Sequence, residues 1–212
     1  MLKKTSPYAG IIGPAIFTLS FLINGCLRPG YDPVRMYVSE LSIGPQGWIQ
    51  MASFVFLGLC LLIFALGLPK YIPSGRASRA GFILLLIIAV CYIASGPLVT
   101  DPLSMFDNQQ TAQGMAHGIF GALVFALSPA CCFVFYGRFR ADERFLRLKT
   151  WTLLAGIIMT LIIVLMKLAQ PQASPLNRWA GLIQRCSLVI FYVWITSFAL
   201  RLRKTAGGKR HG

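Results

Sequence analysis

Three ionisable side chains, His117, Lys167 and Arg185, lie inside long apolar runs of the sequence. A lipid bilayer tolerates such groups only where they find polar partners or water, so they mark a functional site by default. If each run is a helix rising about 1.5 Å per residue, the three lie roughly 4 to 10 Å below the same surface of a membrane. A histidine there can transfer protons, and the two cations can hold an acidic group of the protein or of a ligand.

Acidic residues gather beside these runs. Four of the six acidic residues of the chain, Asp32, Glu40, Asp101 and Asp107, fall in two loops on that side. Acidic residues do little to set membrane topology, so their position calls for another explanation. An unpaired arginine in hydrocarbon costs about 2.5–3.5 kcal/mol. The sequence therefore predicts that Arg185 pairs with Glu40 or Asp101.

Each of these residues also has a simpler structural interpretation. Lys167 can extend its long stem to the lipid headgroups, and Arg185 can do the same from greater depth. His117 can be a core histidine bonded to a carbonyl or to Gln113, four residues earlier on the same helix face. Glu40 can be a solvated loop carboxylate, although its apolar neighbours indicate that it is held against the bundle.

Several catalytic chemistries are disfavoured. A zinc site needs about three ligands, and the second histidine, His211, is in the C-terminal tail. Bis-histidine haem fails for the same reason, so no metal and no cofactor is predicted. Ser39 and Ser42 are possible hydrolase nucleophiles, but no nucleophile elbow surrounds them. Acid–base catalysis by Glu40 and His117 stays open.

The elements that must position these residues are membrane helices. Hydrophobic residues make up 56% of the 212 residues and charged residues 12%, about half the usual charged share. Crossing a bilayer core takes roughly 20 apolar residues of helix, which satisfies its own backbone hydrogen bonds. Six blocks are long enough, near residues 8–27, 48–68, 80–99, 112–136, 151–169 and 179–200. We expect an all-α polytopic bundle that forms a single domain over residues 1–212.

The basic residues orient this bundle. Positive charge concentrates in cytoplasmic loops, and the predicted plasma (inner) membrane protein therefore has both termini in the cytoplasm. Fifteen of the 20 Lys and Arg residues support that orientation: Lys3, Lys4, Lys70, Arg76, Arg79, Arg138, Arg140, Arg144, Arg147, Lys149, Arg201, Arg203, Lys204, Lys209 and Arg210.

The net charge of +14 does not indicate a nucleic-acid partner, because it is divided among short loops and tails. The same residues can hold anionic lipid headgroups, and membrane lipids are the expected partners. All six cysteines lie in or at the ends of apolar runs, which predicts small core residues and no disulfide framework.

The loops that face away from the termini differ in character. The first, from Arg28 to Gly47, is the longest, and within it Ser39 is a candidate cap for a short interfacial helix that Gly44 and Pro45 would end. The second, from Thr100 to Thr111, is rich in acidic and amide side chains. On the other side, the segment 137–150 is expected to form a small surface turn or an amphipathic piece.

Prolines and glycines inside the apolar runs predict two further features. Pro14 and Pro129 are expected to kink their helices. Gly114, Gly118 and Gly121 share a small-xxx-small spacing, which allows a neighbouring helix to approach closely.

Several polar segments resemble a family. Arg28-Pro-Gly-Tyr31-Asp-Pro, then Ser39-Glu40-Leu41-Ser42, and later Thr100-Asp101-Pro102 and Gly114-Met-Ala-His117 resemble a bacterial six-helix membrane family catalogued as domain of unknown function 998. The likeness covers roughly residues 8–200. It implies a six-helix integral membrane protein and brings no known activity, cofactor or catalytic residue.

Together these observations predict one polar pocket that accepts a small amphiphile or a lipid headgroup. Its candidate ligand-binding residues are Tyr31, Ser39, Glu40, Asp101, His117 and Arg185. Two alternatives stay open: an enzyme that uses Glu40 or His117 on a lipid-borne substrate, and a structural subunit in which the glycine face docks a partner helix. The sequence does not decide whether there is catalysis, and it favours binding.

Overall fold

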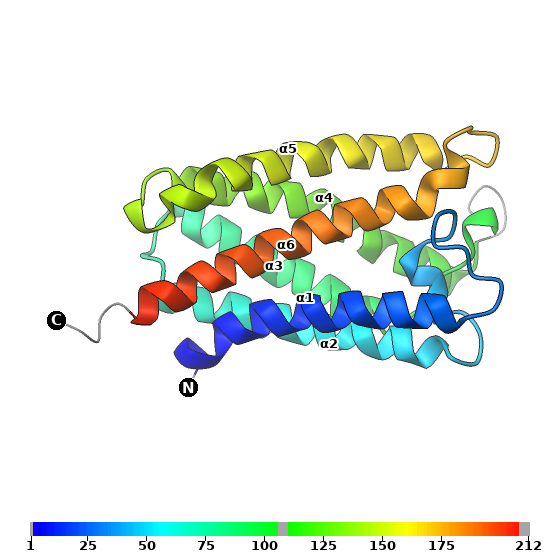
Figure 1. Ribbon diagram of the computed structural model, residues 1–212, viewed down its shortest axis with the longest axis horizontal. Helices are drawn as coiled ribbons and strands as arrows, with labels where there is room; N and C mark the ends of the chain where they lie inside the picture. The colour runs from blue at the N-terminus through cyan, green and yellow to red at the C-terminus, as the bar shows by residue number, and fades with distance from the viewer. Residues whose placement is uncertain (1, 106–109, 208–212) are drawn as a thin grey trace.

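The computed structural model describes residues 2–105 and 110–207, and it contains six long helices (Figure 1). They are α1 (Leu2–Leu27), α2 (Gly47–Gly67), α3 (Arg76–Ser95), α4 (Ala112–Phe139), α5 (Leu146–Ala169) and α6 (Ala180–Gly207). This confirms the predicted all-α bundle. The largest differences in the bounds are at α1, which begins at Leu2 instead of residue 8, and α6, which ends at Gly207 instead of residue 200.

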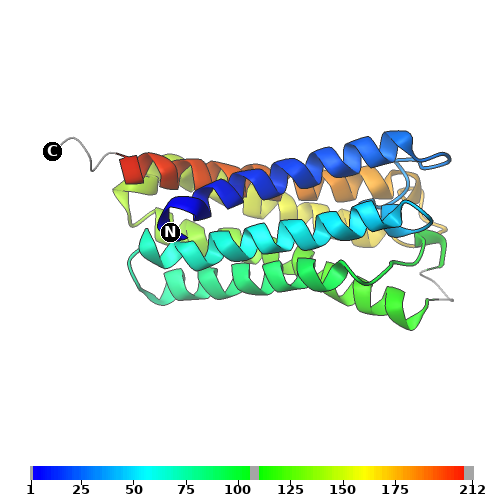
Figure 2. The same cartoon turned by 90° about the horizontal axis from the view of Figure 1, so that it is seen from below.

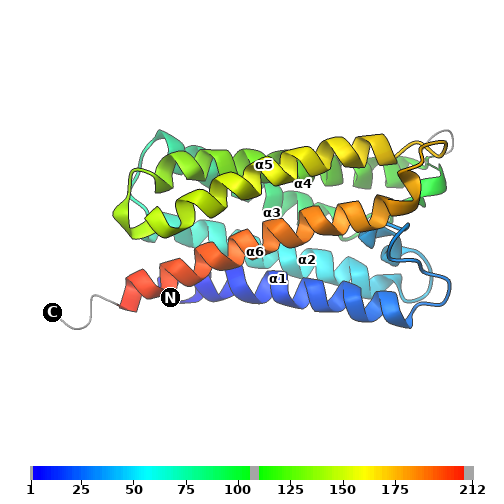
Figure 3. The ribbon, with the colours of Figure 1, turned by 45° about the horizontal axis from the view of Figure 1, so that its top comes forward.

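The helices form a closed ring. Each packs against its neighbours in sequence, and α6 packs back against α1. In Figure 3, α6 crosses the front of the bundle between α5 and α1. All six are long and apolar enough to cross a membrane, so the protein is a multi-pass membrane protein. Large apolar side chains such as Leu19, Val90 and Leu161 are exposed around the ring, as expected where lipid replaces water.

Aromatic side chains fill the middle of the ring. Phe17 of α1 packs against Phe54, Tyr92 and Tyr192, with ring centroids 5.3 to 6.1 Å apart. The hydroxyls of Tyr92 and Tyr192 lie 3.0 Å apart and hydrogen-bond to each other. A buried tyrosine hydroxyl needs such a partner in an apolar interior, so this pair also fixes how α3 and α6 pack.

The start of α1 and the end of α6 lie at the same end of the bundle, which we call the terminal end (Figure 2). It carries the 3-10 helices η2 (Leu68–Lys70) and η4 (Glu143–Phe145). The opposite end, called the distal end, carries η1 (Val38–Ser42), η3 (Leu103–Met105) and η5 (Asn177–Trp179). Most of the basic residues lie at the terminal end, and the membrane side on which it lies stays a prediction.

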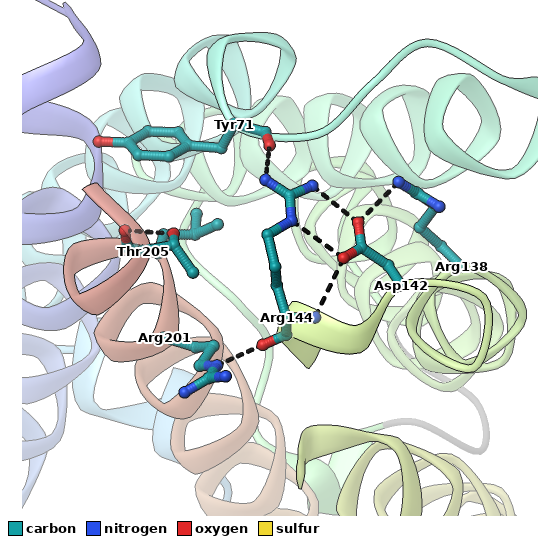
Figure 4. Close-up of polar contacts among 7 residues, drawn as sticks. Tyr71, Arg138, Asp142, Arg144, Arg201 and Thr205 are labelled. Atoms are coloured by element: carbon teal, nitrogen blue, oxygen red, sulfur yellow. Dashed lines mark hydrogen bonds and ion pairs between the residues drawn. The ribbon is translucent and has the colours of Figure 1, made fainter. Parts of the chain in front are cut away.

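A network around Asp142 ties the terminal end together (Figure 4). The Asp142 carboxylate accepts hydrogen bonds from Arg138 Nη2 at 2.8 Å and from Arg144 Nη2 at 2.7 Å. Arg144 also donates to the Tyr71 carbonyl at 3.1 Å, and Arg201 of α6 donates to the Arg144 carbonyl. The hydrogen bond from Arg144 lowers the pKa of Asp142. The connection is shorter than the predicted segment 137–150, because α4 continues to Phe139 and α5 begins at Leu146.

The predictions for the cysteines and for the prolines have different outcomes. Cys60, Cys91, Cys131 and Cys132 are buried core residues, and all six cysteines are free. Cys26 of α1 and Cys186 of α6 are exposed on lipid-facing sides of their helices. The prediction of a core position was wrong for these two residues. Pro14 and Pro129 lie inside continuous helices, and the kinks stay a prediction.

Candidate functional site

The distal loop 28–46 is folded onto the start of α6 by Arg185. Arg185 Nη1 donates to the carbonyls of Pro33 at 2.6 Å, Met36 at 2.8 Å and Gly181 at 3.0 Å. Its Nη2 donates to the Tyr31 hydroxyl, which in turn donates to the Tyr37 carbonyl at 2.9 Å. Backbone dipoles, not a carboxylate, therefore neutralise this cation.

The predicted ion pair of Arg185 with Glu40 or Asp101 was wrong. Within residues 2–105 and 110–207, the ion pairs are those of Asp142 at the terminal end. The physical reason is that a turn supplies several carbonyls converging on one point, and each is an acceptor that needs a partner once it is buried. Asp107, the remaining acidic residue of the second loop, lies outside the described residues.

The same loop completes the first turn of α6. The Gly181 and Leu182 amides donate to the carbonyls of Arg35 at 3.1 Å and Val34 at 2.9 Å, which satisfies groups that a helix start leaves unpaired. Gly181 is required for this approach, because a Cβ there would lie 2.2 Å from the Met36 carbonyl oxygen. The loop is thus an integral part of the bundle.

Glu40 is buried and caps η1. Its carboxylate accepts the Tyr37 amide at 2.8 Å, and its side chain is 2% exposed. The expected cap at Ser39 was therefore wrong: η1 begins at Val38, with Tyr37 as the preceding residue and Glu40 completing the capping box. Burial raises the pKa of Glu40, opposed by backbone hydrogen bonds from Tyr37 and Leu103 and by the charges of Arg28 and Arg185.

This raised pKa predicts a pH-dependent stability. Between the ordinary value of 4.5 and the raised value, folded Glu40 keeps a proton that the unfolded chain has lost, so stability falls as pH rises through that window. We expect Glu40→Gln, which keeps an oxygen for the Tyr37 amide, to remove this component. Melting temperatures should be measured at about pH 4.5 and about pH 8. The melting temperature of the variant, relative to that of the native protein, should be higher at about pH 8 than at about pH 4.5.

Exposed Glu143 is the control for this measurement, because Glu143→Gln removes a carboxylate from the terminal end without changing a buried group. An equal pH response of Glu40→Gln and the native protein would show that Glu40 does not titrate in that window.

Asp101 caps the start of α4. Its carboxylate accepts from the Thr111 amide at 2.7 Å and from the Thr111 hydroxyl at 3.0 Å. Thr111 in turn accepts from the Gly114 amide at 3.0 Å, which makes it the N-cap of the helix. A carboxylate at a helix N-terminus is favoured by the helix dipole, so Asp101 has a structural role here.

His117 is held by the end of α3. Its Nδ1 lies 2.8 Å from the Leu98 carbonyl oxygen, the Ser95 carbonyl also lies within hydrogen-bonding reach of the ring, and the ring meets Phe54 edge-on at 5.6 Å between centroids. A carbonyl can only accept, so Nδ1 carries a proton, and in the neutral imidazole Nε2 is then an acceptor. Gln113 bonds the Pro97 carbonyl at 3.3 Å and not His117.

Beside His117 lies a cavity of about 320 Å³ between α4, α5 and α6, roofed by η1. Its polar lining residues are Tyr37, Ser39, Tyr92, Ser95, Thr100, His117, Lys167, Gln170 and Gln184. Its apolar lining residues are Val38, Phe54, Gly118, Gly121, Ala122, Val124, Phe125, Ala126, Ile163, Met166 and Leu188.

The side of the cavity between α4 and α5 is open. Ala122, Ala126 and Lys167 border it and are exposed. A Cβ added at Gly118 or Gly121 would meet no atom within 4 Å. The prediction that these glycines bring a neighbouring helix close was therefore wrong within this chain: their small size leaves space, which the cavity occupies.

The structure divides the predicted site in two. Ser39 and His117 line the cavity, whereas four predicted residues do not: Tyr31, Glu40, Asp101 and Arg185. Gln184 was missed as a site residue. Its Oε1 accepts the Val38 amide at 2.8 Å, and it borders the cavity. An amide side chain inside the apolar run 179–200 was the available signal.

The chain matches the family described as "Protein of unknown function (DUF998)" over residues 11–201, and therefore belongs to it. This match covers all but the end of α6 and the start of α1. No curated protein and no solved structure matches the chain.

Proposed function

We propose that this member of the DUF998 family binds a small membrane amphiphile in the cavity between α4 and α5. The observation that carries the proposal is the composition of the lining. It combines the polar residues His117, Ser39 and Gln184 with apolar residues of α4 and α5 such as Phe125 and Ile163. Ligand sites combine an apolar lining with a few placed polar groups in this way.

The open side favours a ligand from the membrane. Residues of α4 and α5 that border it belong to segments able to span a bilayer, so lipid lies against the opening. A partner helix is less well accommodated, because a helix with side chains is about 10 Å wide and α4 and α5 already pack together. A lipid chain is narrow enough to enter between them.

Binding is favoured over acid–base catalysis by Glu40 and His117. Glu40 is occupied by the Tyr37 amide and does not line the cavity that His117 borders. General acid–base catalysis needs both groups within reach of one reacting atom, at about 3 Å. Asp101 is likewise occupied by Thr111.

The test is photolabelling in lipid vesicles with a fatty-chain probe that carries a diazirine in its chain. We expect adducts on residues around the opening, including Phe125, Ile163 and Met166. Gly121→Leu fills the opening and should abolish them. Gly137→Leu is the matched control, because Gly137 lies on the same helix in open space and away from the cavity.

Two outcomes would contradict the proposal. One is labelling spread evenly over exposed lipid-facing residues such as Leu19 and Leu161. The other is labelling at the opening that Gly121→Leu leaves unchanged.

We also propose residence in the plasma (inner) membrane with both termini in the cytoplasm, which places the cavity near the outer surface. The many basic residues of the terminal end support this. A reporter active only in the cytoplasm, fused to the C-terminus, should be active; an inactive reporter would reverse the orientation.

A further inference from the structure

Three polar atoms of residues that line the cavity make no hydrogen bond of ordinary geometry with the described residues, and their chemistry defines the ligand further. His117 Nε2 is an acceptor, because Nδ1 donates to the Leu98 carbonyl. The Nε2 of Gln184 is a donor, because the Val38 amide, itself a donor, must face Oε1. Within the described part of the chain, neither that nitrogen nor the Ser39 hydroxyl makes a hydrogen bond.

The neighbouring polar groups are already occupied. The Tyr92 hydroxyl bonds Tyr192, the Ser95 hydroxyl donates to the Cys91 carbonyl at 2.8 Å, and the Thr100 hydroxyl donates to the Asp101 carbonyl at 3.2 Å. A polar group that already makes a hydrogen bond within the protein is not available to bind a ligand. Apart from the rim residues Lys167 and Gln170, the unoccupied set is therefore one acceptor, one amide donor and one hydroxyl.

The charge of the lining is as informative as its hydrogen bonds. Among residues 2–105 and 110–207, no carboxylate lines the cavity, and the cation that does, Lys167, is exposed at the rim and bonds Gln170 at 3.4 Å. Arg185 is committed to three carbonyls and Tyr31 outside the cavity. A charged end placed beside His117 would lose its hydration without gaining a counter-ion there, which is strongly unfavourable.

We infer that the bound amphiphile is a single-chain lipid with an uncharged polar end that carries both a hydroxyl group and a carbonyl oxygen, as a monoacylglycerol does. The hydroxyl donates to His117 Nε2, and the carbonyl accepts from Gln184 Nε2 or from Ser39. The volume of about 320 Å³ is at the small end for ligand sites, which fits one chain and not two. This inference rests on the proposed function.

The test compares four photoprobes with the same diazirine-bearing chain: a glycerol monoester, a methyl ester, a free carboxylic acid and a lysophosphatidic acid. The measured quantity is the concentration for half-maximal labelling of the opening. We expect the glycerol ester to label at roughly tenfold lower concentration than the methyl ester, which has the carbonyl and lacks the hydroxyl.

Two variants identify the contacts. In His117→Asn the side-chain amide can still donate to the Leu98 carbonyl, while the acceptor at Nε2 is lost. We expect the glycerol ester to weaken to the level of the methyl ester, and the methyl ester to stay unchanged. Gln184→Glu keeps an oxygen for the Val38 amide and loses the donor, so both esters should weaken. An unchanged melting temperature establishes that each variant is folded.

The results separate this inference from the proposed function. If no probe labels the opening in a way that Gly121→Leu abolishes, the proposed function fails. If all four probes label equally and Gly121→Leu abolishes them, only the inference fails. If the carboxylic acid or lysophosphatidic acid labels best and Lys167→Gln removes that preference, the ligand is anionic and the inference is overturned.

Discussion

Arg185→Gln will lower the free energy of unfolding by about 3 kcal/mol, because the variant loses charge-assisted hydrogen bonds and strands buried carbonyls. The affected acceptors are those of Pro33 and Met36 in the distal loop, together with the Tyr31 hydroxyl. In detergent this should appear as a fall of roughly 10 °C in melting temperature. Lys167→Gln, which removes an exposed cation at the same end, should change the stability by less than about 0.5 kcal/mol.

A double-mutant cycle shows which partner matters. Because Arg185 bonds Tyr31, the loss in Arg185→Gln combined with Tyr31→Phe should be smaller than the sum of the single losses by about 1 kcal/mol. Combined with Asp101→Asn, the losses should add within about 0.5 kcal/mol. Coupling to Asp101 and additivity with Tyr31 would restore the ion pair and contradict the structure.

Gly114→Ala will destabilise the protein by about 2 kcal/mol, although alanine ordinarily favours a helix interior. A Cβ at position 114 would lie 2.1 Å from Asp101 Oδ2, so the carboxylate must leave Thr111, and the N-cap of α4 loses the partner that holds it. Gly118→Ala, one turn further along the same helix and in open space, should be neutral or stabilising by up to about 1 kcal/mol. Thermal unfolding of the two variants measures the difference.

Removing the obstructing carboxylate provides the control. In an Asp101→Ala background the atoms that a Cβ at 114 would meet are absent, so the penalty of Gly114→Ala should largely disappear. A penalty that persists unchanged in that background would mean that Gly114 is required for another reason.

The sequence was sufficient for the fold and for the end of the bundle where the polar groups meet. Length and apolar content predicted the six helices, because lipid leaves the backbone few alternatives. The positions of Ser39 and His117 at the distal end were also predicted. These properties depend on composition and helix periodicity, which are local in the sequence.

The partners of those groups were not predictable by the same means. Arg185 was expected to pair with a carboxylate, yet it bonds two carbonyls made available by the conformation of the loop 28–42, those of Pro33 and Met36, and the Gly181 carbonyl of its own helix. That conformation includes Gly30 at a φ of +74°, a backbone state that few other residues adopt. The spacing of Gly118 and Gly121 identified a common face but not whether a helix or a cavity lies against it.

The carbonyls that hold Arg185 are made about 150 residues before the arginine itself. During synthesis the loop 28–42 is therefore complete long before α6 exists. Until then its Tyr31 hydroxyl and turn carbonyls are hydrogen-bonded to water or lipid headgroups. Only insertion of the last helix supplies the guanidinium, the Gln184 oxygen for Val38 and the second neighbour of α1. The roof of the cavity is consequently completed late: a nascent chain arrested after α5 carries five membrane segments and no finished cavity.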